Sequence, residues 1–351
     1  MMFERIAPEQ HDTLDGIPEP AENPVLVGHH EARDALASAY HAGKLPHALL
    51  FVGPQGIGKA TFAFHFAYHL LSHVDHRLAP KRLVSPDVSS SLFRQIANGA
   101  HPSILHLTRP LNDKTKSYKS AVTVDEIRKV SRFLSLTSHD GGYRVVIVDP
   151  ADDMNTNAAN ALLKNLEEPP ARTLFVLIAH SLGRLLPTIR SRCQIVRFNP
   201  LADNEVLAVL GGFDTGLPAS ETERTELLAN ASGSPRTAIL LTQYGGLEIA
   251  GALDQLLREP RVPVAQAHKL AEAVAARDQA IAFSLFNDHT LEVVATAATA
   301  AARDGEIERA ERFSQAWQDL RIAMSEADTY NLDRKQHALN MIFRLHDTLR
   351  M

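Results

Sequence analysis

The sequence predicts an α/β fold with a parallel sheet, followed by a C-terminal part made only of helices. Short apolar runs alternate with helical patterns up to about Pro200, a glycine-rich loop follows the first run, and no strand-like run follows that proline. Short runs that are apolar throughout are typical of strands buried on both faces, as in a parallel sheet covered by helices. The predicted strands are 47–52, 103–108, 144–149, 173–179 and 193–198.

Composition limits the kinds of protein this can be. The 351 residues are enough for two or three domains, 45% of them are hydrophobic, and the net charge of −5 does not favour a protein coated by nucleic acid on its own. The single cysteine, Cys193, excludes an intrachain disulfide and a four-cysteine zinc site, and it fits a reducing cytoplasm. The charged N-terminus and the absence of a run of ~18 apolar residues lead us to expect no signal peptide and no membrane span.

The pattern along the chain predicts three domains. Residues 1–24, rich in proline and acids and without periodicity, are predicted to be an arm that leads into an α/β domain over 1–200. Short helices broken by glycines follow over 201–250, and 251–351 is helical throughout. Two apolar stripes in this last part indicate helix packing in a core, with an interface to other chains as the alternative. They are Ala310, Phe313, Trp317, Leu320 and Met324, and then Leu339, Ile342, Phe343 and Leu349.

The stretch GPQGIGKAT, Gly53–Thr61, is close to a phosphate-binding loop. It stands between a predicted strand and a helical pattern, so its backbone N–H groups and the helix dipole are placed to hold an anion. Lys59 would neutralise phosphate charge, but Ala60 occupies the position where the pattern requires a hydroxyl for Mg²⁺. Thr61 is rotated by ~100° around the helix and is not expected to replace it. The candidate nucleotide residues in this loop are Gly53, Gly56, Ile57, Gly58, Lys59, Ala60 and Thr61.

A second chemical position also departs from the pattern of an ATPase. In RVVIVDPADDM, Asp149 ends an apolar strand in the manner of a Walker B aspartate, which holds Mg²⁺. The next position usually carries a glutamate that orients the attacking water, and here it is Pro150, which has no carboxylate. Asp152 and Asp153 follow too late to lie at the strand end. Together with Ala60, Pro150 indicates that hydrolysis is lost.

Three arginines are candidates for contacts with phosphate. Arg190 and Arg192 precede the last predicted strand in LPTIRSRCQIV, where an exposed arginine can point into the site of a neighbouring subunit. Arg236 follows Ser234 and Pro235, which are suited to the N-cap and first position of a helix. An ordinary surface arginine and simple helix capping are the alternatives.

Two further clusters are not expected to carry chemistry. Glu167 and Glu168 are adjacent at a helix end and therefore ~100° apart, so they do not converge on one substrate atom. His65, His69 and His73 share a helix face, but Phe66 stands where a zinc protease has its glutamate. We expect partly exposed helix histidines and no metal.

The chain resembles the delta-prime subunits of the bacterial DNA polymerase III clamp loader, a branch of the AAA+ superfamily. The resemblance runs from about Leu26 to Arg236 through LVGHHEARDAL, LPHALLFVGPQGIGKAT, NAANALLKNLEEPP, LLPTIRSRC and SGSPR. NALLKNLEEPP followed by SRC is specific to clamp-loader subunits, whereas the phosphate loop alone is not. Beyond residue 250 only the helical pattern matches.

The resemblance implies an AAA+ P-loop domain, a small helical lid and an all-α collar that holds a ring of five subunits together. Such a subunit sits beside the tau/gamma and delta subunits and helps to load the sliding clamp onto primed DNA. Arg192 would be an arginine finger that acts in trans on the ATP of the adjacent subunit. Asp149 would be a Walker B remnant and Arg236 a second sensor, with His180 or Ser181 as the first.

The departures from the family pattern concern metal and turnover. Residues 71–110 lack the four cysteines of a zinc module that many relatives carry, so we expect no zinc. The altered loop and Walker B strand agree with a subunit that holds ATP or ADP without turnover, or holds neither. An autonomous AAA+ ATPase that acts on another substrate is the alternative function.

Overall fold

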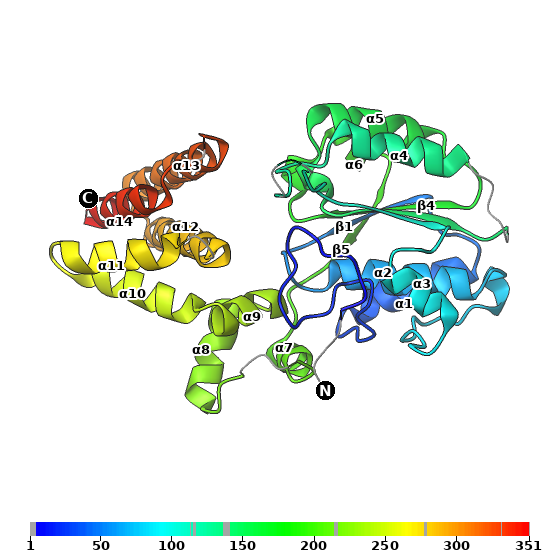
Figure 1. Ribbon diagram of the computed structural model, residues 1–351, viewed down its shortest axis with the longest axis horizontal. Helices are drawn as coiled ribbons and strands as arrows, with labels where there is room; N and C mark the ends of the chain where they lie inside the picture. The colour runs from blue at the N-terminus through cyan, green and yellow to red at the C-terminus, as the bar shows by residue number, and fades with distance from the viewer. Residues whose placement is uncertain are drawn as a thin grey trace. The chain divides into compact units, whose positions relative to one another are not determined.

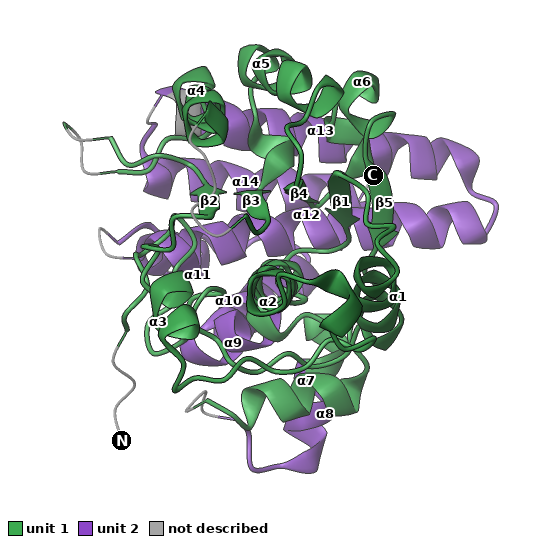
Figure 2. Cartoon of the chain, turned by 90° about the vertical axis from the view of Figure 1, so that its right-hand side faces the viewer, with its two compact units in different colours: residues 1–214, 228–236 green, residues 215–227, 237–351 purple. Residues whose placement is uncertain are grey.

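The computed structural model describes residues 5–112, 114, 117–135, 141–213, 217–276, 279–330 and 332–350. The chain forms two compact units, which are coloured separately in Figure 2. The first consists of Met1–Asp214 and Leu228–Arg236, and the second of Thr215–Leu227 and Thr237–Met351.

The first unit is built on a sheet of five strands that pair only in parallel, in the order β2-β3-β4-β1-β5. The predicted α/β fold with a parallel sheet is confirmed, and each predicted strand agrees with the structure to within one residue at either end. The strands are β1 Ala48–Val52, β2 Ile104–Leu107, β3 Arg144–Val148, β4 Thr173–Ala179 and β5 Gln194–Arg197.

Helices cover both faces of this sheet, and that explains why its strands are apolar without alternation. Successive side chains of a strand point to opposite faces, so Leu49 and Phe51 pack into one core cluster while Leu50 and Val52 pack into another. The first cluster lies under helices α1, α2 and α3, and the second under α4, α5 and α6 (Figure 1). These helices are α1 His30–His41, α2 Lys59–Ser72, α3 Ser91–Ala97, α4 Val124–Ser135, α5 Thr156–Glu167 and α6 Pro187–Arg190.

Short elements complete the first unit. Three 3₁₀ helices, η1 His76–Leu78, η2 Ala151–Asp153 and η3 Leu182–Arg184, lie in its connections, and α7 spans Asp203–Leu210. Helices α8 Glu221–Ala231 and α9 Pro235–Gln243 are each divided between the two units. The predicted lid over 201–250 is therefore shared by both units, and its separation as a domain stays a prediction.

The second unit buries a helical core. Its helices are α10 Gly246–Arg258, α11 Val264–Ala275, α12 Ala280–Arg303, α13 Ile307–Tyr330 and α14 Arg334–Arg350. In α13, Phe313, Leu320 and Met324 of the predicted stripe are buried in this core. In α14, Ile342 is buried but the next residue, Phe343, is 37% exposed, because adjacent helical residues point ~100° apart. None of the described helices is both long enough and apolar enough to cross a membrane.

One buried histidine makes the stability of the first unit depend on pH. The His69 side chain is 1% exposed, and neither ring nitrogen has a hydrogen-bond partner among the described residues. Burial, with a smaller contribution from His73, lowers the pKa of His69 to about 4. The unfolded chain takes up a proton at this residue below about pH 6.5, whereas the folded chain does not until about pH 4. Stability is therefore lost as the pH falls through this window.

We expect His69→Phe, which keeps a buried ring but cannot ionise, to reduce the loss of unfolding free energy between pH 7 and pH 5 by about 1–2 kcal/mol. Urea unfolding followed by circular dichroism at both pH values measures this difference. The control His30→Phe replaces an exposed histidine and should keep the wild-type loss. An unchanged loss in His69→Phe contradicts the assignment.

Candidate nucleotide site

The parallel sheet brings the predicted nucleotide residues to one edge. Gly53 follows β1, Asp149 follows β3, and His180 follows β4, which lies between them in the sheet. The carboxyl ends of parallel strands lie at the same edge, where α/β proteins bind their ligands. Helix α2 starts at Lys59 after Gly58, as the sequence predicts.

The phosphate-binding loop needs glycine at two positions, and a histidine from another segment of the chain holds it in place. Gly56 and Gly58 have φ values of 76° and 93°, which favour glycine. His29 Nε2 donates a hydrogen bond to the Ile57 carbonyl over 2.7 Å, and the Ile57 side chain is buried. The sequence does not predict His29 as a site residue, because His29 lies more than twenty residues before the loop and carries no local signal for this contact.

Lys59 is engaged by the loop that carries it. Its Nζ donates hydrogen bonds to the carbonyl oxygens of Gly53, over 2.7 Å, and Pro54, and its side chain is buried. Burial lowers the pKa of Lys59 to about 8, although Asp149 and Asp152 raise it in part. A phosphate must therefore compete with two carbonyl groups for this ammonium group.

Ala60 and Pro150, which depart from the sequence pattern of an ATPase, also lack the required side-chain groups in the structure. Ala60 packs partly buried against the first core cluster, and the Thr61 side chain that follows is buried. Burial, followed by the nearby charge of Asp12, raises the pKa of Asp149 to about 7. The buried Pro150 comes next and supplies no carboxylate. The glycines and Lys59 suit a phosphate, but of Ala60, Asp149 and Pro150 only Asp149 has a side-chain oxygen, so these three positions do not fit Mg²⁺.

The next two aspartates have structural partners instead. Asp152 Oδ2 accepts hydrogen bonds from the backbone N–H groups of His180, over 3.1 Å, and Ser181, over 3.2 Å. Burial would raise the pKa of Asp152, but the hydrogen bonds from the His180 side chain and backbone outweigh it, and the pKa is lowered. Asp153 accepts a hydrogen bond from Arg109 Nε over 2.7 Å.

Ser234 and Arg236 close over the phosphate-binding loop from a distant part of the sequence. Ser234 Oγ donates to the Gln55 carbonyl over 3.0 Å. A methyl group added at Gly56 would lie 2.3 Å from Arg236 Cβ and 2.6 Å from Ser234 Oγ, so this packing leaves no room for a side chain. Arg236 Nη1 lies 3.6 Å from Asp12 Oδ2. The sequence predicts Arg236 as a site residue, but no feature of the sequence indicates Asp12.

Arg192 lies at the opposite edge of the sheet. It precedes β5, whereas Phe198, which follows β5, has its backbone carbonyl against Gly53. Phe198 is six positions after Arg192, and at ~3.3 Å per residue this separation spans roughly 15–20 Å. Arg192 Nη2 is 2.7 Å from Glu167 Oε1, and both side chains are partly exposed. Arg192 is therefore remote from the phosphate-binding loop of its own chain.

A family model and several known proteins match this chain. A family model described as DNA polymerase III, delta subunit, matches residues 28–202. A DNA polymerase III subunit delta-prime from Pseudomonas aeruginosa is 35% identical over 71% of this chain and 71% of its own length. This chain belongs to the delta-prime family. Delta-prime subunits from Escherichia coli and Bacillus subtilis are 30% and 36% identical, over 64% and 47% of this chain. The matches span 63% and 46% of those two relatives, less than two thirds of their length.

Two of the three histidines on one face of α2, His65 and His73, make hydrogen bonds to backbone carbonyls in this delta-prime family member. His65 Nε2 donates to the Asn23 carbonyl over 2.8 Å, and His73 Nδ1 to the His69 carbonyl over 2.9 Å. His65 and His69 are buried, so the expectation that these histidines are partly exposed is wrong for them. In the described part of the chain, no group of three or more His, Cys, Asp or Glu residues is placed to hold a metal ion.

The packing of Gly56 leads to a stability prediction. Gly56→Ala introduces both a left-handed alanine and a clash with Arg236 and Ser234, whereas Gly16→Ala, at a similar φ of 71°, meets no atom within 4 Å. The backbone strain should cost about 1–2 kcal/mol in both variants, and the clash about 1–3 kcal/mol more in Gly56→Ala. Urea unfolding followed by circular dichroism compares them, and equal losses would contradict the close packing of Gly56.

Proposed function

We propose that this chain is a clamp-loader subunit of DNA polymerase III that contributes an arginine finger in trans and hydrolyses no ATP itself. It takes its place in a ring of five subunits with tau/gamma and delta subunits. The complex opens the sliding clamp and loads it onto primed DNA in the cytoplasm. The fold is the AAA+ arrangement of a P-loop domain over 1–200, a lid over 201–250 and a collar over 251–351.

The observation that supports this proposal is that the altered nucleotide residues and Arg192 lie at opposite edges of one sheet. The edge with the phosphate-binding loop has Ala60 and Pro150 at the two positions that hydrolysis needs. The other edge presents Arg192 on the surface, with Glu167 as an ion-pair partner. A partly exposed ion pair of this kind contributes little stability, so Arg192 can leave Glu167 for the phosphates of a neighbouring subunit.

The remaining family roles are proposed for residues with suitable positions. Arg236, packed on Gly56, is the second sensor. We propose His180 rather than Ser181 as the first sensor, because its Nδ1 lies 3.3 Å from Asp152 Oδ1 and its ring is close enough to Asp149 to act on that carboxyl group. Gly53, Gly56, Gly58 and Lys59 hold ATP or ADP without turnover.

The trans role of Arg192 is tested by Arg192→Ala in a loader reconstituted with tau/gamma and delta subunits. Removal of an arginine finger lowers the rate at the site it serves by several orders of magnitude, so we expect the clamp-loading rate to fall by about 10-fold or more. Arg128→Ala is the matched control, because Arg128 also lies on the surface with a carboxylate partner at 2.7 Å. It should keep the wild-type rate.

ATP hydrolysis by the purified chain distinguishes the proposal from an autonomous ATPase. If the chain were an autonomous ATPase, it would hydrolyse ATP at the rate of a motor subunit, and Lys59→Ala would abolish this activity. We expect no such hydrolysis, and a loader that is insensitive to Arg192→Ala would refute the proposed function.

A further inference from the structure

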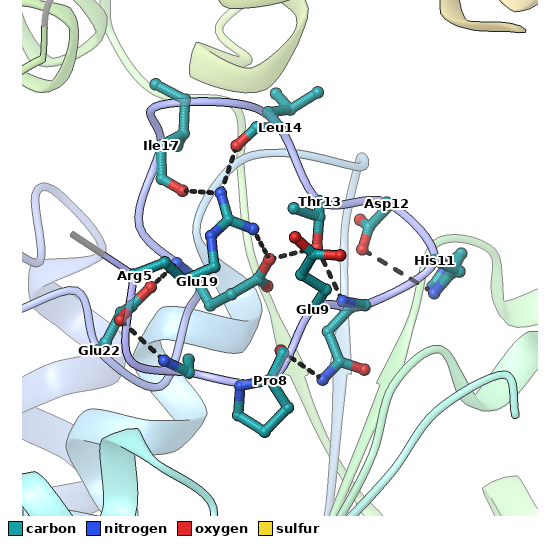
Figure 3. Close-up of polar contacts among 12 residues, drawn as sticks. Arg5, Pro8, Glu9, His11, Asp12, Thr13, Leu14, Ile17, Glu19 and Glu22 are labelled. Atoms are coloured by element: carbon teal, nitrogen blue, oxygen red, sulfur yellow. Dashed lines mark hydrogen bonds and ion pairs between the residues drawn. The ribbon is translucent and has the colours of Figure 1, made fainter. Parts of the chain in front are cut away.

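Within the predicted N-terminal arm, residues 5–22 form a loop that is held by specific polar contacts. Arg5 Nη1 pairs with Glu19 Oε1 at 3.0 Å, and Arg5 Nη2 donates to the carbonyls of Leu14 and Ile17 over 2.7 Å and 3.0 Å (Figure 3). Glu22 Oε2 accepts the backbone N–H groups of Ile6 and Ala7. Glu19 and Glu22 are 6% and 5% exposed, so the base of the loop is fixed by buried carboxylates with partners.

The tip of this loop, residues 9–13, lies against the segments that follow β2 and β3. Tyr118 Oη donates to the Glu9 carbonyl over 2.9 Å, and the His11 ring packs edge-on against the Tyr118 ring, with centroids 6.4 Å apart. Arg109 and Asp153, which pair with each other, lie close enough to His11 to act on its charge. The tip therefore rests at the carboxyl edge of the sheet, beside the phosphate-binding loop.

Asp12 brings a carboxylate to the arginine of this edge. Its Oδ2 lies 3.6 Å from Arg236 Nη1, and Arg236 packs directly on Gly56 of the phosphate-binding loop. The same negative charge acts on Asp149, which lies at the end of β3. A guanidinium group binds carboxylate and phosphate with the same N–H donors, so one Arg236 cannot fully serve both anions.

The charges of the site are thus balanced without a nucleotide. Asp12 faces Arg236, and the Lys59 ammonium group is held by the Gly53 and Pro54 carbonyls. An incoming phosphate would meet the negative charge of Asp12 beside the Arg236 cation that should attract it, and like charges at this range repel.

We infer that the N-terminal loop is a built-in cap of the nucleotide site, in which Asp12 occupies Arg236 in place of a phosphate. A nucleoside diphosphate or triphosphate then binds only when the tip of the loop withdraws. This inference rests on the proposed assignment of Gly53–Thr61 as a nucleotide loop, but it does not depend on the role of Arg192.

The test is the affinity of the isolated full-length chain for a fluorescent ADP, N-methylanthraniloyl-ADP. Asp12→Asn keeps the shape of the side chain and removes its charge, and we expect it to lower the dissociation constant at least fivefold. Asp34 lies on α1, and its Oδ1 is 3.6 Å from Arg82 Nε, the same distance that separates Asp12 from Arg236. Asp34→Asn is therefore the matched control. It should change the dissociation constant by less than twofold.

Combining Asp12→Asn with Arg236→Gln tests whether Asp12 acts through Arg236 or only through its general negative charge. If Asp12 acts by occupying Arg236, Asp12→Asn should give less than a twofold gain in a chain that already carries Arg236→Gln. A full gain in that background, equal gains in Asp12→Asn and Asp34→Asn, or no gain in Asp12→Asn would each overturn the inference. Circular dichroism spectra confirm that the variants are folded. Failure here leaves the reconstituted loader sensitive to Arg192→Ala, so it is distinguishable from failure of the proposed function.

Discussion

The single direction of the five strands is the constraint on which the arrangement of the site depends. Because β1, β3 and β4 are parallel neighbours, the residues that follow them must meet at one edge, although Gly53 and Asp149 are far apart in the sequence. The same constraint sends Arg192, which precedes β5, to the other edge. An antiparallel β5 would have brought Arg192 next to the phosphate-binding loop of its own chain. The separation of the two edges is therefore a consequence of topology.

The sequence predicts the strands and the loop well because the signals for them are local. A strand buried on both faces is a continuous apolar run, and the glycine loop lies directly between such a run and a helix. The strand order and the docking of Ser234 and Arg236 on Gly56 involve contacts between distant segments, for which a single sequence has no local signal. The N-terminal loop is the clearest case. Its shape depends on hydrogen bonds of Arg5 and Glu22 with backbone groups and on the ion pair between Arg5 and Glu19, and such contacts leave no periodicity.

Electrostatics explains why the site is stable with its two chemical positions altered. Lys59, Asp149 and Asp152 remain close together, and burial pushes the pKa of Lys59 down and that of Asp149 up. Both shifts reduce the free-energy difference between the charged and neutral forms of groups that would otherwise be costly to bury. The hydrogen bonds from His180 and Ser181 keep Asp152 charged in the same region. The charged groups at this edge are thus compensated in part by one another and by backbone N–H groups.

A phosphate-binding loop that is held in place by its own chain is consistent with the proposed role of this subunit in a ring. The phosphate-binding loop is held in place by His29, Ser234 and its own lysine. Close-packed interiors have low compressibility, so a sheet with one edge held in this way has little freedom to shift its other edge. Arg192 would then be offered to the neighbouring subunit from a fixed position. Under the proposed function, the loss of turnover at one edge and the delivery of an arginine from the other would both depend on the same sheet.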